Sequence, residues 1–298
     1  MAAWKEIKDK IQSVKNTGKI TRAMELISTV KMKKAQDAVM SARPFAQSAL
    51  KVMSHIIDAI KSSPFCKSPD QIQNKKLVVL VTSNRGLCGG YNVNLFRSLS
   101  EQKEAYSGTI EYVTVGKKAR EFISRTGETL VADFSDIFWD NIDLQETKNL
   151  SQELKELYLS WEYDEVEILY SYYVSAISQV PVYRDFYPLK QDTMMEFLEK
   201  MTGETDTTPT WLEYDIEPSK QAIVDQVIPM ILEVMFYEML LEAKASEHAA
   251  RMVAMKNASE NAGERAKLYT LQYNKARQTS ITTEVSEIVS GVESMKEI

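Results

Sequence analysis

Apolar side chains at helical spacing occupy both ends of this chain, and they limit what it can fold into. Apolar residues recur at steps of three and four through the first sixty residues, and again from Pro218 to Ile298, as on one face of an α-helix. At about 1.5 Å per residue these helices would extend for roughly 87 Å and 115 Å. Helices of that length are unlike those of an ordinary globular domain.

Two such helices can bury their stripes against each other. We therefore predict an antiparallel pair, with independent helices in a bundle as the alternative. The N-terminal stripe includes Ile7, Ile11, Val14, Ile20, Met24, Ile27 and Val30, with an interruption at residues 16–18. Pro44 should bend or break the first helix. Near the C-terminus, Ile281, Val285, Ile288 and Val292 follow steps of four, three and four, the spacing of a coiled-coil seam.

The middle of the chain has a different period. After a polar segment at 61–75, apolar β-branched runs alternate with helical patterns, which indicates a mostly parallel, doubly wound sheet. The predicted strands are 76–83, 110–116, 129–134, 165–176 and 181–190, and the predicted helices are 92–104, 117–127 and 147–161. Residues 191–212 are predicted to be a surface loop.

The predicted fold class is therefore α+β. An antiparallel coiled coil of long N- and C-terminal helices carries an inserted α/β domain, Rossmann-like and with a mostly parallel sheet. The expected boundaries are 1–60 for the first helix, 76–205 for the α/β domain and 213–298 for the last helix.

Charge is unevenly distributed along the chain. The net charge is −6, which does not suggest a nucleic-acid binder. Residues 1–34 hold nine Lys/Arg against three Asp/Glu, whereas residues 128–170 hold twelve acids against two Lys. The acids are expected to be solvated. A basic helix is either solvated in the same way or docks on an acidic partner.

Cysteine and histidine are too sparse for a disulfide framework or a histidine-based metal site. Cys66 and Cys88 show no metal-ligand spacing, and there are two histidines, so we expect no metal and a reducing compartment. The N-terminus is charged from Lys5 onward, unlike a signal peptide. No run approaches the roughly 20 apolar residues of a membrane-spanning helix. The sequence predicts a soluble protein, or at most a peripheral one.

The most motif-like segment is the glycine-rich turn at residues 85–90, between a predicted strand and a predicted helix. Backbone N–H groups at such a junction can hold a phosphate, but neither GxGxxG nor GxxxxGK[ST] is present. The glycines are otherwise explained by positive φ and close packing. Cys88 at a helix start is a candidate nucleophile, with a buried structural thiol as the alternative. The sequence shows no catalytic constellation.

Four segments resemble the gamma subunit of the F-type ATP synthase. KITRAMELISTVKMKKAQD at 19–37 resembles the family's N-terminal helix. RGLCGGYN at 85–92, RMVAMKNASENAG at 251–263 and LQYNKARQTSITTEVSEIVSG at 271–291 are similar to its other characteristic segments. They cover essentially the whole chain in the family's order.

The resemblance implies a rotating shaft with no catalytic residues or cofactor of its own. In the family, the terminal helices lie inside a ring of alpha and beta subunits, and the α/β domain lies near the epsilon subunit and the membrane c-subunit ring. The lack of a transit peptide suggests a bacterial protein on the cytoplasmic face of the cell membrane. The remaining alternatives are an α/β enzyme using the glycine turn and a homodimeric coiled-coil scaffold.

Several positions match the family's contact residues, and the resemblance gives them roles. The residues expected to face the beta subunit are Lys19, Arg22, Met24, Lys31, Lys33, Lys34, Arg277, Gln278 and Thr282. Glu217 matches the foot region near the rotor ring. Two features depart from the family pattern. Asn84 stands where Asp is common before the Arg of RGLCGG, and the tip at 292–298 is unusually charged.

Overall fold

The computed structural model describes residues 2–41, 44–45, 48–49, 63–66, 73–136, 142, 144–202 and 219–296. The chain divides into two compact units, residues 1–28 with 252–298, and residues 29–251. The division falls inside two long helices, α1 (Ala2–Ser41) and α7 (Lys220–Lys296). Each unit is described here by itself.

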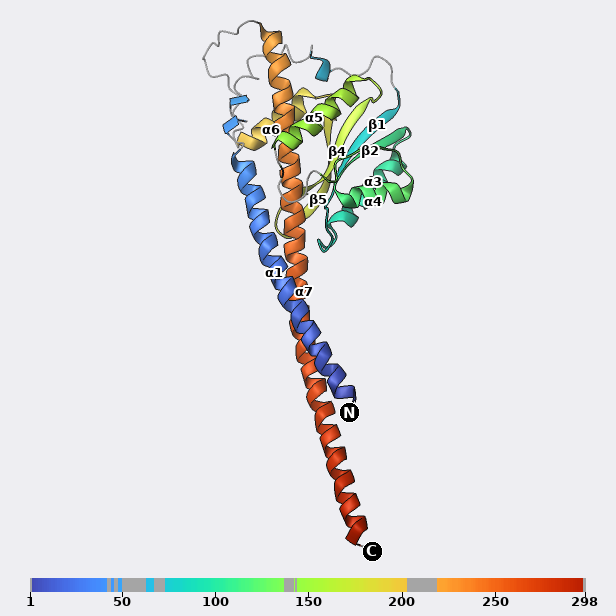
Figure 1. Ribbon diagram of the computed structural model, residues 1–298. Coiled ribbons are helices and arrows are strands. Elements are labelled where there is room, and N and C mark those ends of the chain that lie inside the picture. The colour runs from blue at the N-terminus through green and yellow to red at the C-terminus, as the bar shows by residue number, and fades with distance from the viewer. Residues whose placement is uncertain are drawn as a thin grey trace. The chain divides into compact units, whose positions relative to one another are not determined.

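In the described part of residues 29–251, five strands form one sheet in the order β3-β2-β1-β4-β5 (Figure 1). The strands are β1 (Lys75–Val81), β2 (Thr109–Val115), β3 (Leu130–Asp133), β4 (Glu165–Tyr173) and β5 (Gln179–Tyr187). β1 pairs in parallel with β2 and β4, and β2 with β3, whereas β5 returns antiparallel to β4. The predicted fold class, with its mostly parallel sheet, is confirmed.

The central strand β1 explains why the sheet needs cover on both faces. Its side chains alternate between two apolar clusters, with Leu77 and Val79 in one and Val78 and Leu80 in the other, all fully buried. Such two-sided burial is typical of parallel strands. Helices α3 (Tyr91–Ala105) and α4 (Lys117–Thr126) supply the smaller cluster, while α5 (Leu144–Leu159) and α7 supply the larger one.

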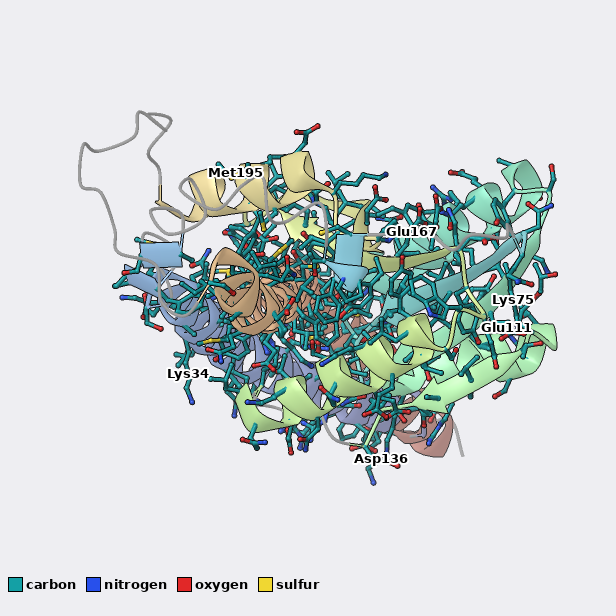
Figure 2. All side chains as sticks on the ribbon, turned by 90° about the horizontal axis from the view of Figure 1, so that it is seen from above. Lys34, Lys75, Glu111, Asp136, Glu167 and Met195 are labelled. Atoms are coloured by element: carbon teal, nitrogen blue, oxygen red, sulfur yellow. The ribbon has the colours of Figure 1, made fainter. Side chains whose placement is uncertain are left out.

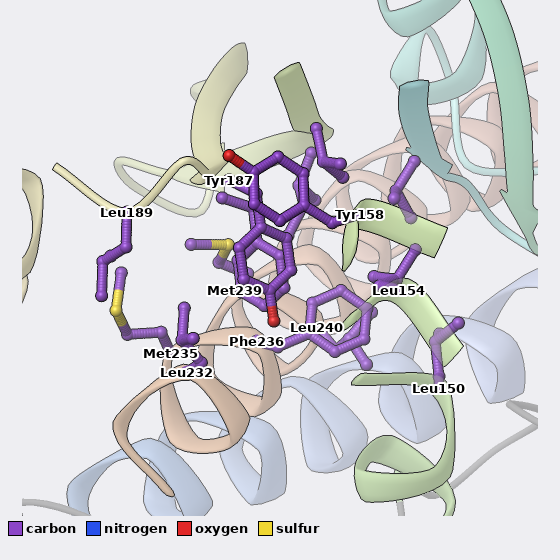
Figure 3. Close-up of a cluster of buried hydrophobic side chains, with 14 of the residues drawn as sticks. Leu150, Leu154, Tyr158, Tyr187, Leu189, Leu232, Met235, Phe236, Met239 and Leu240 are labelled. Atoms are coloured by element: carbon purple, nitrogen blue, oxygen red, sulfur yellow. The ribbon is translucent and has the colours of Figure 1, made fainter. Parts of the chain in front are cut away.

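The first part of α7 belongs to the core of this unit. Ile228, Leu232, Phe236 and Leu240 are buried in the larger cluster, together with the stacked rings of Tyr158 and Tyr187, whose centroids lie 4.7 Å apart (Figure 3). A helix that is apolar on several sides is suited to such burial. This segment of the C-terminal helix therefore builds the α/β core, and Val39 of α1 and the buried Ala49 contribute to the same cluster.

Helix α6 (Gln191–Thr202) contradicts the predicted loop at 191–212. Met194 and Phe197 on α6 are buried in the larger cluster, and this packing stabilises the helix. The loop was predicted because the sequence that follows α6 is polar. Residues 203–212 lie outside the described residues. The predicted continuation of the first helix to residue 60 is also largely outside them, although residues 44, 45, 48 and 49 are helical.

In the unit formed by residues 1–28 and 252–298, α1 and α7 run antiparallel (Figure 1). The Trp4 and Tyr273 rings meet edge to face at 6.1 Å between centroids. Farther along α1, the Ser259 hydroxyl donates to the Gly18 carbonyl at 3.3 Å. The partner number falls as the α1 number rises, so the predicted antiparallel pair is confirmed.

Small side chains, not the predicted large ones, are the buried residues of α1. Ile20, Ile27 and Val30 are 56–69% exposed, whereas Thr21 and Ser28, seven residues apart, are buried. The interruption predicted at residues 16–18 is a site of close approach, because a Cβ on Gly18 would lie 3.3 Å from the Ala262 Cβ. α1 continues through it without a break.

Substituting Gly18 with leucine should therefore destabilise the helix pair. Overpacking of a close contact costs about 1–3 kcal/mol, so Gly18→Leu should lower the urea midpoint of the full-length chain, followed by helical circular dichroism. Gly263→Leu is the matched control, since a Cβ there meets nothing within 4 Å and leucine favours a helix over glycine by about 1 kcal/mol. Equal midpoints for the two variants would contradict this packing.

Candidate functional site

The predicted basic residues of α1 lie mainly on its surface. Lys19, Arg22, Lys33 and Lys34 are exposed, and Lys31 is half-buried. Figure 2 shows Lys34 extending outward from the ribbon. Arg22 is partly neutralised within its own helix, because its guanidinium contacts Glu25 at 2.7 Å. The exposed ammonium groups of Lys19 and Lys33 lie on the surface of the same helix, where ion pairs contribute little to stability.

Met24 is half-buried in the same stretch of α1. Leu26 and Ile27 beside it are exposed by 55% and 56%. Basic and apolar side chains therefore share one surface of this helix, a mixture that the prediction of a buried apolar stripe missed.

The predicted C-terminal contact residues form a second surface. Arg277, Gln278 and Thr282 are exposed, the Arg277 guanidinium lies 6.0 Å from the centre of the Tyr273 ring, and the Thr282 hydroxyl donates to the Gln278 carbonyl. Gly18 packs at Ala262, so Lys19 lies roughly 22 Å from Arg277 along the axis at 1.5 Å per residue. The two predicted groups are therefore separate surfaces. Glu217 lies outside the described residues.

Apolar residues near the end of α7 are exposed in this chain. Five of them, Ile281, Val285, Ile288, Val289 and Val292, are 50–67% exposed. α1 meets α7 at Tyr273 through Trp4, close to its own N-terminus, so it does not reach them. The interpretation of residues 281–292 as a seam with α1 is wrong, and Val289 was missed because it falls outside the seam spacing.

The glycine turn directs backbone carbonyls, not N–H groups, at a charged side chain of the same chain. The Arg85 and Gly86 carbonyls accept hydrogen bonds from the Arg251 side chain at 3.2 and 3.4 Å, whereas an anion cradle presents N–H groups. Leu87 and Gly89 adopt positive φ of 63° and 57°, which turns the chain sharply. The geometry supports the packing role of these glycines over a phosphate site.

Neither cysteine is activated as a nucleophile. Burial raises the pKa of the Cys88 thiol, against smaller opposing effects of Ser83 and Arg251. Burial also raises the pKa of Cys66 to about 11. The thiolate is the reactive form, so both residues are structural thiols, the alternative that the sequence left open for Cys88.

Asn84 has a structural role despite its departure from the family pattern. Its side-chain oxygen accepts from the Lys117 backbone N–H at 2.8 Å, and Lys117 is the first residue of α4. The N-cap residue Gly116 offers no side-chain acceptor, so Asn84 caps α4 from another segment of the chain.

Several acids of residues 128–170 are paired with cations and not freely solvated. Glu167 is 8% exposed, and its carboxylate binds the Lys76 ammonium at 2.8 Å. Asp133 of the same segment contacts the Arg120 guanidinium at 3.1 Å. Outside this segment, the Lys75 ammonium on β1 lies 3.0 Å from the Glu111 carboxylate on β2; Figure 2 labels both residues, close to each other. The prediction of a solvated acidic surface is therefore wrong for Glu167, which a strand places inside the domain.

Charged residues form a buried cluster on α7. Glu247 binds the Lys244 ammonium at 3.0 Å and the Arg251 guanidinium at 2.8 Å. Burial alone would raise its pKa, but these cations bring the pKa of Glu247 below its usual value. The Arg251 guanidinium lies 3.2 Å from His248 Nδ1. A guanidinium offers only donors, so Nδ1 accepts and the imidazole is neutral.

Comparison with known proteins decides the family. The family model described as ATP synthase matches residues 3–295. The ATP synthase gamma chain of Geobacter metallireducens is 38% identical over 99% of this chain and 100% of its own length. That of Moorella thermoacetica is also 38% identical over 99% and 100%. The chain belongs to the ATP synthase gamma chain family.

Chains in solved structures of ATP synthases share the fold. The rotor of the Euglena gracilis mitochondrial ATP synthase in rotational state 1 aligns with a TM-score of 0.63 at 20% identity, covering 94% of this chain and 99% of that one. A second structure of that enzyme, in rotational state 3, gives 0.66 at 20% identity, covering 98% and 94%. The resemblance found in the sequence is confirmed. Among the described residues, no helix is long and apolar enough to cross a membrane.

His248 should make the stability of the chain pH-dependent. Burial, aided by Arg251, Lys244 and Lys31 and opposed by Glu247, lowers the pKa of His248 to about 4. Unfolded histidine titrates near 6.5, so the unfolded chain binds more protons between these values and stability falls as pH falls. At pH 5, the free energy of unfolding should be lower by about 2 kcal/mol than at a pH where His248 is neutral in both states.

Chemical denaturation of the full-length chain between pH 7 and pH 5 measures this dependence. His248→Gln keeps an acceptor for Arg251 but does not titrate, and it should remove most of the slope. The same slope in both proteins would show that His248 is not its source.

Proposed function

We propose that this chain is the central rotor shaft of an F-type ATP synthase. It transmits torque between a proton-driven membrane rotor and a catalytic alpha/beta ring, and it carries no catalytic residue or cofactor itself. The observation that carries the proposal is the exposed apolar stretch at 281–292. Half-exposed Ile and Val side chains on an unpaired helix are favourable in an assembly that surrounds them.

The paired helices suit the transmission of torque. Where α1 and α7 pack at Gly18 and Ala262, two backbones approach closely, and a paired helix is stiffer than a linker. A rotor must also avoid strong binding at any one angle. Exposed charge pairs contribute about 0–1 kcal/mol each, which is weak enough for the shaft to leave one subunit and meet the next.

The contact residues keep the roles that the family resemblance gives them. Two groups of residues of this chain would face the beta subunit. The group on α1 is Lys19, Arg22, Met24, Lys31, Lys33 and Lys34. The group on α7 is Arg277, Gln278 and Thr282. Glu217 would lie at the foot near the membrane c-subunit ring, with the epsilon subunit beside the α/β domain. The complex would be peripheral, on the cytoplasmic face of a bacterial cell membrane. The boundaries expected from the sequence, 1–60, 76–205 and 213–298, remain a proposal for the limits of the shaft and the domain.

The stretch at 281–292 provides the test. Replacing Ile281, Val285, Ile288 and Val292 by serine removes four half-exposed side chains, each contributing about 1 kcal/mol when buried by a partner. We expect affinity for the ring to fall roughly a hundredfold to a thousandfold. The matched control, Glu284→Ser with Glu287→Ser, alters exposed polar residues of the same turns and should assemble normally.

Native mass of the complex isolated through this chain is the measurement. The wild type should carry one copy with three alpha and three beta subunits and hydrolyse ATP, and the serine variant should yield little of this complex. A homodimer without ATPase activity would favour the scaffold, and normal assembly of the serine variant would show that the stretch is not buried by the ring.

A further inference from the structure

Arg251 connects the glycine turn of the α/β domain to helix α7. Its side chain makes four contacts within hydrogen-bond distance. Two reach the Arg85 and Gly86 carbonyls, more than 160 positions earlier in the chain, and two hold it to Glu247 and His248 on its own helix. The guanidinium therefore bridges two segments that the sequence places far apart.

The bridge is buried and its charge is compensated. Arg251 is 7% exposed, Glu247 4% and His248 6%. A buried guanidinium is stable only when its donors have acceptors, and here a carboxylate, two carbonyls and an imidazole supply them. The rigid planar fork fixes the direction of each donor, so the turn is held at a defined angle to the helix.

A second contact anchors the same part of the domain to α7. The Tyr91 hydroxyl, at the start of α3, donates to the Ala243 carbonyl at 3.2 Å. Ala243 and Arg251 lie roughly 12 Å apart along the helix at 1.5 Å per residue. Attachment at two separated points resists both sliding and rotation of the domain on the helix, whereas a single contact would act as a pivot.

We infer that Arg251 is the positioning residue that makes the α/β domain and α7 turn as one body. Torque applied to the domain then passes into the helix through the Arg251 guanidinium and the turn at residues 85–90, in addition to the apolar core that α7 shares with the domain. This inference rests on the proposed shaft function. It assigns Arg251 to coupling between rotation and ion transport, not to the stability of the ring contacts.

Arg251→Gln tests the inference, and Lys244→Gln is the matched control. Each removes one of the two cations on Glu247, and Arg251 is the one whose hydrogen bonds reach the Arg85 and Gly86 carbonyls. In membranes containing the whole complex, Arg251→Gln should keep ATP hydrolysis within about twofold. Protons pumped per ATP should fall severalfold. Lys244→Gln should pump as many protons per ATP as the wild type. Arg251→Lys should give a value between those of Arg251→Gln and Lys244→Gln.

Equal pumping per ATP in Arg251→Gln and the wild type would overturn the inference, and so would equal losses in the two Gln variants. If Arg251→Gln does not assemble, protons pumped per ATP are compared between Arg251→Lys and Lys244→Gln instead, and equal values would overturn the inference. A wild-type complex whose pumping does not require this chain would instead overturn the proposed function.

Hydrogen exchange of the full-length chain tests, without the complex, whether Arg251 holds the turn at residues 85–90. Amides of residues 85–90 should exchange about tenfold faster in Arg251→Gln than in the wild type, while those of residues 243–249 should change little. Unchanged exchange at residues 85–90 would show that Arg251 does not hold the turn, whatever the chain does in its assembly.

Discussion

The structure depends on the burial of one end of α7 in the α/β core. Phe236 and its apolar neighbours pack under the sheet, against Tyr158 and Tyr187, so the helix cannot be separated from the domain without exposing a large apolar surface. Polar contacts then fix the angle of that packing. Glu247, His248 and Arg251 follow the apolar segment directly along α7, and they turn a hydrophobic attachment, which has no direction, into a directional one.

The other end of α7 follows the opposite principle. Where it pairs with α1, Gly18 and Ala262 approach closely and the Trp4 and Tyr273 rings meet, while Ile20 of α1 stays exposed. Ile288 lies beyond the part of α7 that α1 reaches, and it is exposed as well. A seam of small residues lets two helices approach closely while their large side chains remain available to a partner. The exposed apolar surface of α1 is thus a consequence of how the pair packs, whereas the exposed residues 281–292 of α7 lie beyond the pair.

Much of the fold could be predicted from the sequence, because the buried runs of β1, β2 and β4 and the spacing of their helices are local signals. The helix α6 was missed because it depends on tertiary burial of Met194 and Phe197. Part of the apolar stripe of α1 was assigned to the wrong face. Ile20, Ile27 and Val30 are exposed, since buried Thr21 and Ser28 carry little hydrophobic signal, whereas Ile7, Ile11 and Val14 are half-buried. The Arg251 contact could not be predicted, because its spacing of 165 positions from Gly86 leaves no pattern in one sequence.

The most direct test of the shaft is to watch this chain turn. A single cysteine at Ile177, which is 86% exposed on the loop between β4 and β5, would carry a visible probe while the alpha/beta ring is fixed to a surface. The account predicts continuous rotation in one direction when ATP is added, and none without it. ATP hydrolysis by the same fixed complexes with a stationary probe would contradict the account.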